Sequence, residues 1–314
     1  MSRFAIQSDV NIKINGPIIT RPLNINVPSR SNQDRGRNWT IGSSRGDIDI
    51  LLVADGHGLN GTLYSEFAVS WFNEIIKSES IDWEQEDLTE TLRVTILSLE
   101  TKAKEMYRDR YGGTTLSLFI RRGSVDNWVV NLGDSEVVMF DKSSKTHAIL
   151  SEAHCPANIN EVKRMKSTHP DTVFEYDKQV KGCPILHVYE QVNEEWVKKS
   201  IPTSNVYYKN VESELAMYFG DGVRFRLSTT RSIGDFHFKE SFGASAEPYI
   251  RKLEPLTEDQ VVFIATDGFW DCWKYSEVTE FLQNKSLDDL EKVHVEKADG
   301  YFGSSKDDTF LYII

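Results

Sequence analysis

Apolar positions along the chain follow two different periods, which predict an order of strands and helices. Residues 51–54 form a continuous apolar run at the end of a strand predicted over 48–54, as is typical of a buried strand. Residues 63–77 and 88–107 carry apolar side chains three and four positions apart, which predicts two long amphipathic helices. Further strands are predicted over residues 39–41, 114–120, 128–132, 136–140, 147–150, 261–266 and 310–314.

The same patterns indicate one or two strands within residues 1–27 and short helices over 158–166, 276–284 and 287–293. Runs of strands and runs of helices, without strict alternation, favour an α+β domain. Residues 167–222 carry only scattered strand-like pieces, at 173–174, 185–189 and 206–208, among polar residues. Their Tyr, Val, Ile and Phe content argues against disorder.

Composition narrows the class of protein. The chain has 314 residues, 39% of them hydrophobic and 27% charged, as in ordinary soluble proteins. A formal net charge of -12 argues against nucleic acid or an anionic membrane as the main partner. No apolar run reaches the ~18 residues of a membrane span, and the N-terminus lacks the apolar core of a signal peptide. The three cysteines, Cys155, Cys183 and Cys272, are too scattered for a disulfide framework or a zinc site, so we expect a cytoplasmic protein that can diffuse into the nucleus.

Three predicted strands end at an aspartate with a glycine beside it. These are Asp55, Asp134 and Asp267, and the pair Asp307-Asp308 stands just before the last strand. Carboxylates gathered at strand ends repel one another, and a divalent cation removes that conflict. Oxygen ligands without a Cys or His pair point to Mg²⁺ or Mn²⁺ and away from zinc. For the segment 55–58 alone, a turn in which Asp55 caps its own backbone is an equal alternative.

Eight short blocks, in family order, resemble the metal-dependent protein phosphatases of type 2C, the PPM family of Ser/Thr phosphatases. Each block alone is weak, and their order over most of the chain is what makes the resemblance specific. The blocks lie at residues 32–34 (Asn-Gln-Asp), 55–58 (Asp-Gly-His-Gly), 111–115 (Tyr-Gly-Gly-Thr-Thr), 131–135 (Asn-Leu-Gly-Asp-Ser), 152–156, 228–236, 265–271 and 306–308 (Lys-Asp-Asp).

The resemblance implies a fold and an activity. The fold is a β-sandwich of two packed antiparallel sheets with helices on both outer faces, a four-layer α-β-β-α arrangement. It forms a single catalytic domain over residues 1–314, with an enlarged flap or insertion at about 166–222. The expected enzyme is a monomeric protein-serine/threonine phosphatase that depends on Mg²⁺ or Mn²⁺ and acts on phosphorylated proteins in signalling.

The resemblance also implies a dinuclear site with two Mg²⁺ or Mn²⁺ ions. By the matching positions, Asp55 bridges the two ions and the carbonyl oxygen of Gly56 binds one of them. Asp267 and Asp307 bind the other, and Asp134 with Asp267 would hold a weaker third ion. A metal-activated water then attacks the phosphomonoester, so no nucleophilic Cys or Ser is needed.

Two further matches complete the chemistry that the resemblance implies. Asp34 corresponds to a carboxylate that orients metal-bound water, and His57 to a general acid that protonates the leaving seryl or threonyl oxygen. Relatives commonly bind the substrate phosphate with an arginine five residues before Asp34, where this chain has Ser29. Arg30 is therefore either the substrate-binding residue or a plain surface arginine.

Two other functions stay open at this point. One is a pseudophosphatase that acts as a binding or scaffold module, because Ser29 departs from the pattern and the insertion is long. The other is a metal-dependent phosphatase of a small molecule. The presence of every matching carboxylate favours an active enzyme over the scaffold.

Overall fold

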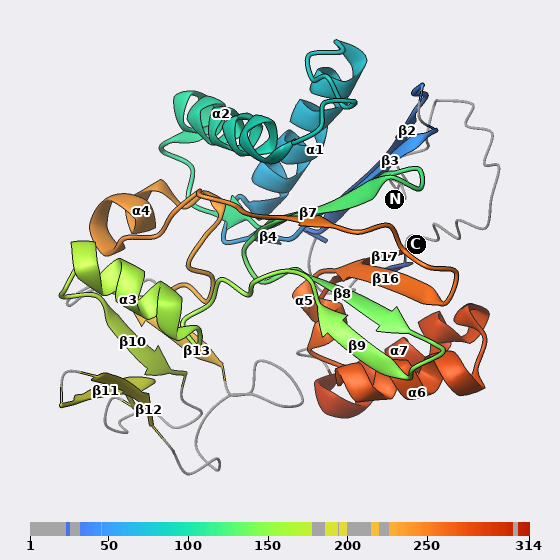
Figure 1. Cartoon of the computed structure of the whole chain (residues 1–314). Coiled ribbons are helices and arrows are strands. Elements are labelled where there is room, and N and C mark those ends of the chain that lie inside the picture. Colours follow the sequence, from blue (N-terminus) through green and yellow to red (C-terminus); the bar gives the residue numbers. More distant parts are fainter. Residues whose placement is uncertain are drawn as a thin grey trace, which may run out of the picture.

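Two five-stranded antiparallel sheets form the framework of the chain in the computed structural model (Figure 1). The structure describes residues 23–25, 32–44, 46–177, 186–193, 195–199, 215–219, 226–303 and 307–314. The first sheet has the order β15-β7-β6-β3-β2, with β2 Arg35–Ile41, β3 Ile48–Ala54, β6 Leu116–Arg122, β7 Asp126–Leu132 and β15 Tyr249–Leu253. The second has the order β1-β17-β16-β8-β9, with β1 Leu23–Ile25, β8 Glu136–Asp141, β9 Thr146–Ile149, β16 Gln260–Ala265 and β17 Thr309–Ile313.

Strand β3 is buried along its whole length because both of its faces are covered. Leu51 and Val53 lie in one buried cluster with Ile264 of the second sheet. Ile50 and Leu52 lie in another cluster, on the opposite face, with the helices that follow β3. Since successive side chains of a strand point to opposite faces, the apolar run of β3 supplies both clusters.

Leu51, Val53 and Ile264 belong to a cluster that both sheets share. On its other face, each sheet packs against helices. On the first sheet these are α1 Gly61–Lys77 and α2 Thr89–Tyr107, whose Phe72 and Leu92 are fully buried. On the second sheet, Phe269, Trp273 and Phe281 pack with Phe263 of β16. The helices there are α5 Asp267–Trp270, α6 Tyr275–Asn284, the 3-10 turn η2 Leu287–Asp289 and α7 Leu290–Tyr301.

A further group of elements lies beside the sheets, on the left of Figure 1. It has its own buried cluster, which includes Met165, Phe174, Tyr218 and Phe238. Its elements are α3 Ile159–Thr168, β10 Val173–Tyr176, β11 Tyr189–Val192, β12 Glu195–Lys198, β13 Ala216–Phe219 and α4 Phe236–Phe242. The described part of the segment 166–222 thus packs around a core that it shares with α3 and α4.

A small three-stranded sheet joins three distant parts of the chain. Its order is β14-β5-β4, with β14 Ile233–Gly234, β5 Gly113–Thr114 and β4 Gly56–His57. The register places Gly113 opposite both His57 and Gly234. Residues that lie far apart in sequence therefore meet directly after β3.

The predicted α+β class, with several antiparallel sheets and helices, is confirmed. The helix predicted over 287–293 instead opens as the 3-10 turn η2 and continues as α7 to Tyr301. Strand β15 and helix α4 were not predicted, since each is short and carries little periodic signal. The strand-like piece at 206–208 and most of residues 1–27 lie outside the described residues.

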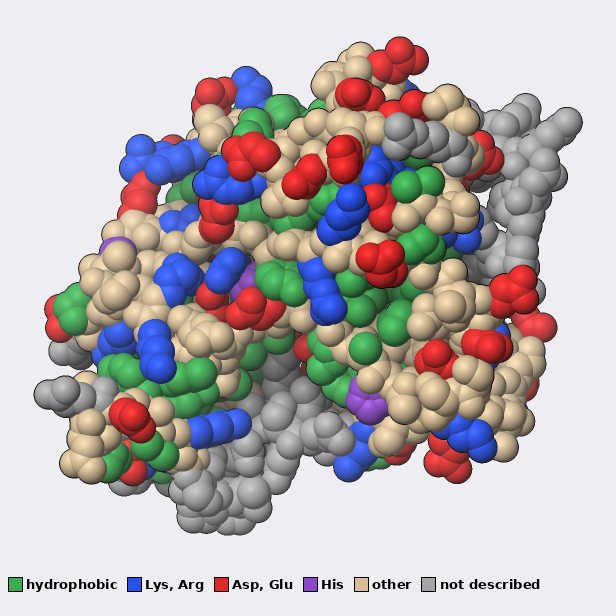
Figure 2. Space-filling view, in the orientation of Figure 1, with side chains coloured by type: hydrophobic (Ala, Val, Ile, Leu, Met, Phe, Trp, Pro, Cys, Tyr) green, Lys and Arg blue, Asp and Glu red, His purple; other side chains and the backbone are tan. Residues whose placement is uncertain are grey.

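The surface shown in Figure 2 carries acidic and basic side chains interspersed, in keeping with the modest excess of carboxylates in the sequence. Within the described part of the chain, no helix combines the length and apolarity needed to cross a membrane.

Candidate active site

The backbone of Asp55 is held in place at the point where β3 gives way to β4. The Asp55 amide donates to Thr115 Oγ1 at 3.0 Å, and the Asp55 carbonyl oxygen accepts from the Thr115 amide at 2.9 Å and from Thr114 Oγ1 at 2.9 Å. Gly56 follows, and a Cβ on it would lie 2.6 Å from the carbonyl oxygen of Gly61. Only glycine allows the start of α1 to pack this closely against the residue next to Asp55.

Asp267 and Asp307 come together because two segments of the second sheet run side by side. The Thr266 amide donates to the carbonyl oxygen of Phe310 at 3.0 Å, and the Phe310 amide donates to Thr266 Oγ1 at 2.9 Å. A Cβ on Gly268 would lie 1.9 Å from the carbonyl oxygen of Asp308. The glycine after Asp267 is therefore what lets the segment before β17 approach.

Asp34 supplies a buried carboxylate from the first sheet, immediately before β2. Its side chain is 3% exposed, and its Oδ2 has no hydrogen-bond partner among the described residues. Burial raises the pKa of Asp34 well above its usual value, and the charge of Asp307 raises it further. The side chain of Thr266 acts in the opposite direction and lowers the pKa of Asp34. An unpartnered buried oxygen next to another carboxylate is a position that a cation would stabilise.

Asp55 lies within the same electrostatic group. Burial raises its pKa well above the usual value, followed by the charges of Asp34, Asp267 and Asp307. Four carboxylates from two different sheets thus disfavour one another's charged forms. Clustered carboxylates of this kind suit a hard divalent cation such as Mg²⁺ or Mn²⁺.

The cluster is a loose one. Among the described residues, no three His, Cys, Asp or Glu side chains are gathered tightly enough to form a finished ligand set. Asp307 is exposed, whereas its neighbour Asp308 is 3% exposed. The evidence for a common site is electrostatic: the charges of Asp267 and Asp307 raise the pKa values of both Asp34 and Asp55. Such charge effects extend beyond contact distance. The chemistry of the donor set, carboxylate oxygens only, fits divalent ions such as Mg²⁺ or Mn²⁺.

His57 stands at the edge of this cluster, with its side chain 22% exposed. Its Nε2 lies 2.6 Å from Oδ2 of Asp235, which is buried at the start of α4. Burial is the largest single effect and lowers the pKa of His57, but the charge and hydrogen bond of Asp235 and the charges of other carboxylates together leave the pKa raised. Asp134, in the turn between β7 and β8, and Asp267 act in the same direction. The protonated imidazole, the form that can donate a proton, is thereby favoured.

Asp235 is the residue whose role sequence reasoning did not identify. Its block, Ser-Ile-Gly-Asp at 232–235, predicts a residue that fixes a turn, and the family pattern places it near enough to the site for a role around the metal ions as the alternative; neither interpretation includes a contact with His57. Its contact with His57 spans 178 positions along the chain. The contact arises from the small β14-β5-β4 sheet, which local patterns do not reveal.

The predicted substrate arginine, Arg30, lies outside the described residues. The nearby Arg35 is already committed to other partners. Its Nη2 donates to Glu66 Oε1 at 2.7 Å, and its Nη1 donates to the carbonyl oxygens of Asn32 at 2.9 Å and Asp34 at 2.8 Å. Arg35 therefore stabilises the segment around Asp34 and is not available as a phosphate ligand.

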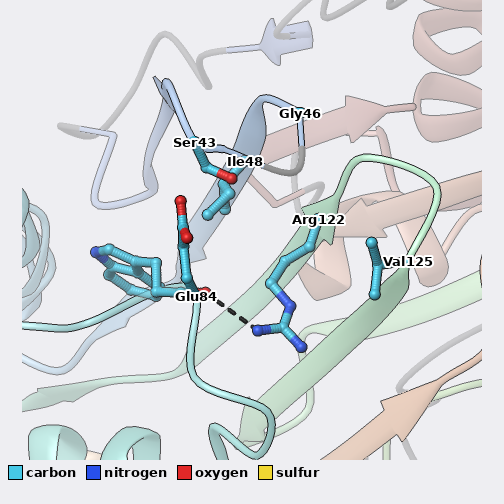
Figure 3. Close-up of a pocket in the computed structure, with 7 residues that line it drawn as sticks. Ser43, Gly46, Ile48, Glu84, Arg122 and Val125 are labelled. Atoms are coloured by element: carbon cyan, nitrogen blue, oxygen red, sulfur yellow. Dashed lines mark hydrogen bonds between the residues drawn. The ribbon is translucent and has the colours of Figure 1, made fainter.

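A water-sized pocket lies at the opposite end of β3, lined by Ser43, Gly46, Ile48, Trp83, Glu84, Arg122 and Val125 (Figure 3). Its two charged groups have partners within the protein: the Glu84 carboxylate accepts from the amide and the hydroxyl of Ser44 at 2.7 and 2.8 Å. Arg122 Nε donates to Asp126 Oδ1 at 2.6 Å, and Arg122 Nη1 donates to the Trp83 carbonyl oxygen at 3.1 Å. We assign this pocket a structural role only.

Comparison with known proteins identifies the family. The profile of the family "Protein phosphatase 2C" matches residues 29–301. "Probable protein phosphatase 2C 35" of Arabidopsis thaliana is 24% identical over 288 residues, which cover 91% of this chain and 75% of that protein. "Probable protein phosphatase 2C 61" of the same plant is 25% identical over 232 residues, which cover 72% of this chain and 61% of that protein.

Solved structures show the same fold at low sequence identity. The crystal structure of the Ser/Thr phosphatase Stp1 from Staphylococcus aureus aligns with a TM-score of 0.59 and 14% identity, covering 97% of each chain. The family and its curated members support protein Ser/Thr phosphatase activity and imply dependence on a divalent metal. This chain therefore belongs to the protein phosphatase 2C family.

Proposed function

We propose that this protein is a Mg²⁺- or Mn²⁺-dependent phosphatase that hydrolyses phosphoserine and phosphothreonine in proteins. The observation that carries the proposal is a cluster of four carboxylates beside His57, those of Asp34, Asp55, Asp267 and Asp307. Their negative charges raise the pKa values of Asp34 and Asp55. Repelling carboxylates next to a proton donor have no evident structural benefit, and they match what metal-assisted phosphomonoester hydrolysis requires.

The residues that would hold two ions are Asp55 as the shared ligand, the Gly56 carbonyl oxygen, Asp267 and Asp307. Asp134 with Asp267 is the candidate for a weaker third ion, and Asp34 would orient a water by hydrogen bonding. When bound, such ions make water acidic enough to act as a nucleophile and neutralise the phosphoryl oxygens. Arg30 remains the candidate for binding the substrate phosphate.

His57 is the proposed general acid. An alkoxide leaving group needs a proton as the phosphorus–oxygen bond breaks, and an imidazolium supplies it near neutral pH. Because Nε2 lies against Asp235, Nδ1 is the ring nitrogen that can donate to the leaving oxygen. The imidazole is then neutral, and its Nε2–H still donates to Asp235.

For the architecture we propose one catalytic domain over residues 1–314 in the four-layer α-β-β-α arrangement, with the insertion at about 166–222 acting as a flap. The shared cluster of Leu51, Val53 and Ile264 supports face-to-face packing of the two sheets. A monomer in the cytoplasm or nucleus agrees with the scattered cysteines.

The direct test is hydrolysis of a phosphothreonine peptide with Mn²⁺ and with EDTA, in the wild type and in Asp55→Ala and Asp267→Ala. We expect activity with Mn²⁺, none with EDTA, and losses on the order of 10²-fold or more in both variants. Asp259→Ala is the matched control, because exposed Asp259 lies at the far end of β16 from Asp267. A folded wild type that neither hydrolyses the peptide nor binds Mn²⁺ in calorimetry would refute the proposal.

A further inference from the structure

The buried carboxylate of Asp235 faces the candidate general acid. Asp235 Oδ2 lies 2.6 Å from His57 Nε2, and Ser232 Oγ donates to the same oxygen at 2.6 Å. The Asp235 side chain is 3% exposed, whereas that of His57 is 22% exposed. One end of the imidazole is therefore anchored inside the protein, while the ring remains open to solvent.

The backbone at Asp235 is unusual in a way that serves this contact. Its φ of 46° and ψ of 39° place it in the left-handed region, which a non-glycine residue adopts at a cost of about 1 kcal/mol. The Asp235 amide donates to the carbonyl oxygen of Gly112 at 2.9 Å, and Gly234 before it has a φ of +90°. The chain turns sharply here, and the turn brings the carboxylate to His57.

The facing strand leaves room for the carboxylate only because it carries a glycine. A Cβ on Gly113 would lie 2.2 Å from Asp235 Oδ2 and 2.7 Å from the carbonyl oxygen of Ile233. Gly113 also pairs with His57 in the register of β4 and β5. The same small sheet therefore sets the backbone positions of both partners and the space between them.

We propose that Asp235 is a positioning residue that holds the His57 ring so that Nδ1 faces the leaving oxygen. This rests on the proposed function, in which His57 protonates the leaving group. Asp235 accepts the Nε2–H hydrogen bond throughout the step. The proton lost from Nδ1 goes to the seryl or threonyl oxygen, and the proton on Nε2 stays where it is.

The alternative role for Asp235 is that of a carboxylate around the metal ions. The structure favours the positioning role, because His57 and Ser232 both contact Oδ2 of Asp235, each at 2.6 Å. The two roles differ in what they predict for metal affinity and for the dependence on leaving group.

The test compares Asp235→Asn with the wild type on two substrates. A phosphothreonine peptide loses an alkoxide and needs the proton, whereas p-nitrophenyl phosphate loses a stable phenolate and does not. We expect kcat for the peptide to fall on the order of 10²-fold, and that for p-nitrophenyl phosphate to change by about 3-fold or less. His57→Gln should show the same selectivity, and adding Asp235→Asn to it should cause no further loss.

Two measurements separate this role from the alternatives. Mn²⁺ affinity in calorimetry should match the wild type, since a carboxylate near the metals would weaken binding when replaced. Nitrogen NMR of the metal-free protein, at a pH high enough to keep the ring neutral, should show the His57 ring with its hydrogen on Nε2 in the wild type and a changed tautomer in Asp235→Asn. The NMR result does not depend on turnover, so it distinguishes failure of this inference from failure of the proposed function.

Equal losses on both substrates, weakened Mn²⁺ binding, or an unchanged His57 tautomer would each overturn the inference. If Asp235→Asn does not fold, Ser232→Ala provides a milder test, because it removes one donor to Oδ2 and leaves the carboxylate in place. We expect a smaller loss for the peptide with the same sparing of p-nitrophenyl phosphate, and a loss without that selectivity would argue against the inference.

Discussion

The guanidinium of Arg231 holds the buried carboxylate of Glu161 in a two-pronged contact. Arg231 Nη2 lies 2.5 Å from Oε1, and Arg231 Nε lies 3.1 Å from Oε2. Glu161 is on α3 and 1% exposed, and Arg231 lies two residues before β14. The pair therefore connects the segment that leads to Asp235 with a helix outside the two large sheets.

Replacing Glu161 should destabilise the fold strongly, because Arg231 would be left partly buried without its counter-charge. We expect Glu161→Gln to lower the free energy of unfolding by about 3 kcal/mol, measured by urea denaturation. The matched control is Glu105→Gln, which breaks an exposed pair with Lys102 on α2 and should change stability by less than about 0.5 kcal/mol. Similar effects in the two variants would show that the buried pair adds nothing.

His154 should make stability dependent on pH. It is fully buried, and its Nδ1 accepts from the Gly133 amide at 3.1 Å. Burial, with Arg231 and Arg164 in the same direction, lowers its pKa to about 3. The unfolded chain, with a histidine pKa of about 6.5, binds more protons between these two values. The contribution of neutral His154 to the free energy of unfolding is therefore complete above pH ~6.5. It is lost as the pH falls toward the pKa of His154 in the folded protein.

We expect His154 to make the free energy of unfolding fall by about 3 kcal/mol between pH 6.5 and pH 4. In His154→Asn this fall should be smaller, because part of the pH dependence is removed. Asparagine keeps an acceptor for the Gly133 amide and does not titrate. His237→Asn, at an exposed position on α4, serves as the control and should follow the wild type. Urea denaturation across this range checks the difference, and parallel curves for the wild type and His154→Asn would contradict it.

Removing one carboxylate from the candidate metal site should stabilise the metal-free protein. Asp34→Asn relieves the repulsion from Asp307 and Asp267, and we expect a gain of roughly 1 kcal/mol in the presence of EDTA. Saturating Mn²⁺ should raise the melting temperature of the wild type more than that of the variant. Asp259→Asn is the control. If Asp34→Asn were less stable than the wild type in EDTA, the carboxylates would not repel one another as proposed.

Gly113→Ala should impair both stability and catalysis, because its methyl group would displace the Asp235 carboxylate. We expect about 2 kcal/mol of destabilisation and a loss of peptide hydrolysis that spares p-nitrophenyl phosphate. Gly42→Ala is the matched control, since a Cβ there meets nothing within 4 Å. Thermal unfolding and the two-substrate assay check this, and an unaffected Gly113→Ala would mean that Asp235 tolerates displacement.

Sequence patterns predicted the sheets and long helices well, because elements such as β3 and α1 carry strong periodic signals. Apolar strands that end in a carboxylate pointed to Asp55, Asp134 and Asp267, and the family resemblance added Asp34. The pairing of His57 with Asp235 could not be predicted, since it depends on register in a sheet of two-residue strands. Helix α4 was missed because seven residues hold too few turns for a periodic pattern.

The position of β17 also determines when the site can form during synthesis. In its sheet β17 lies between β1 and β16, and Asp307 stands two residues before its first residue, Thr309. It follows every other strand in the described part of the chain. A nascent chain that has not yet reached Thr309 has the aspartates of the first sheet but an open edge on β16, which is prone to pair with other chains. Phosphatase activity should therefore begin when β17 inserts beside β16. The same step covers the open edge of β16 and prevents it from pairing with other chains.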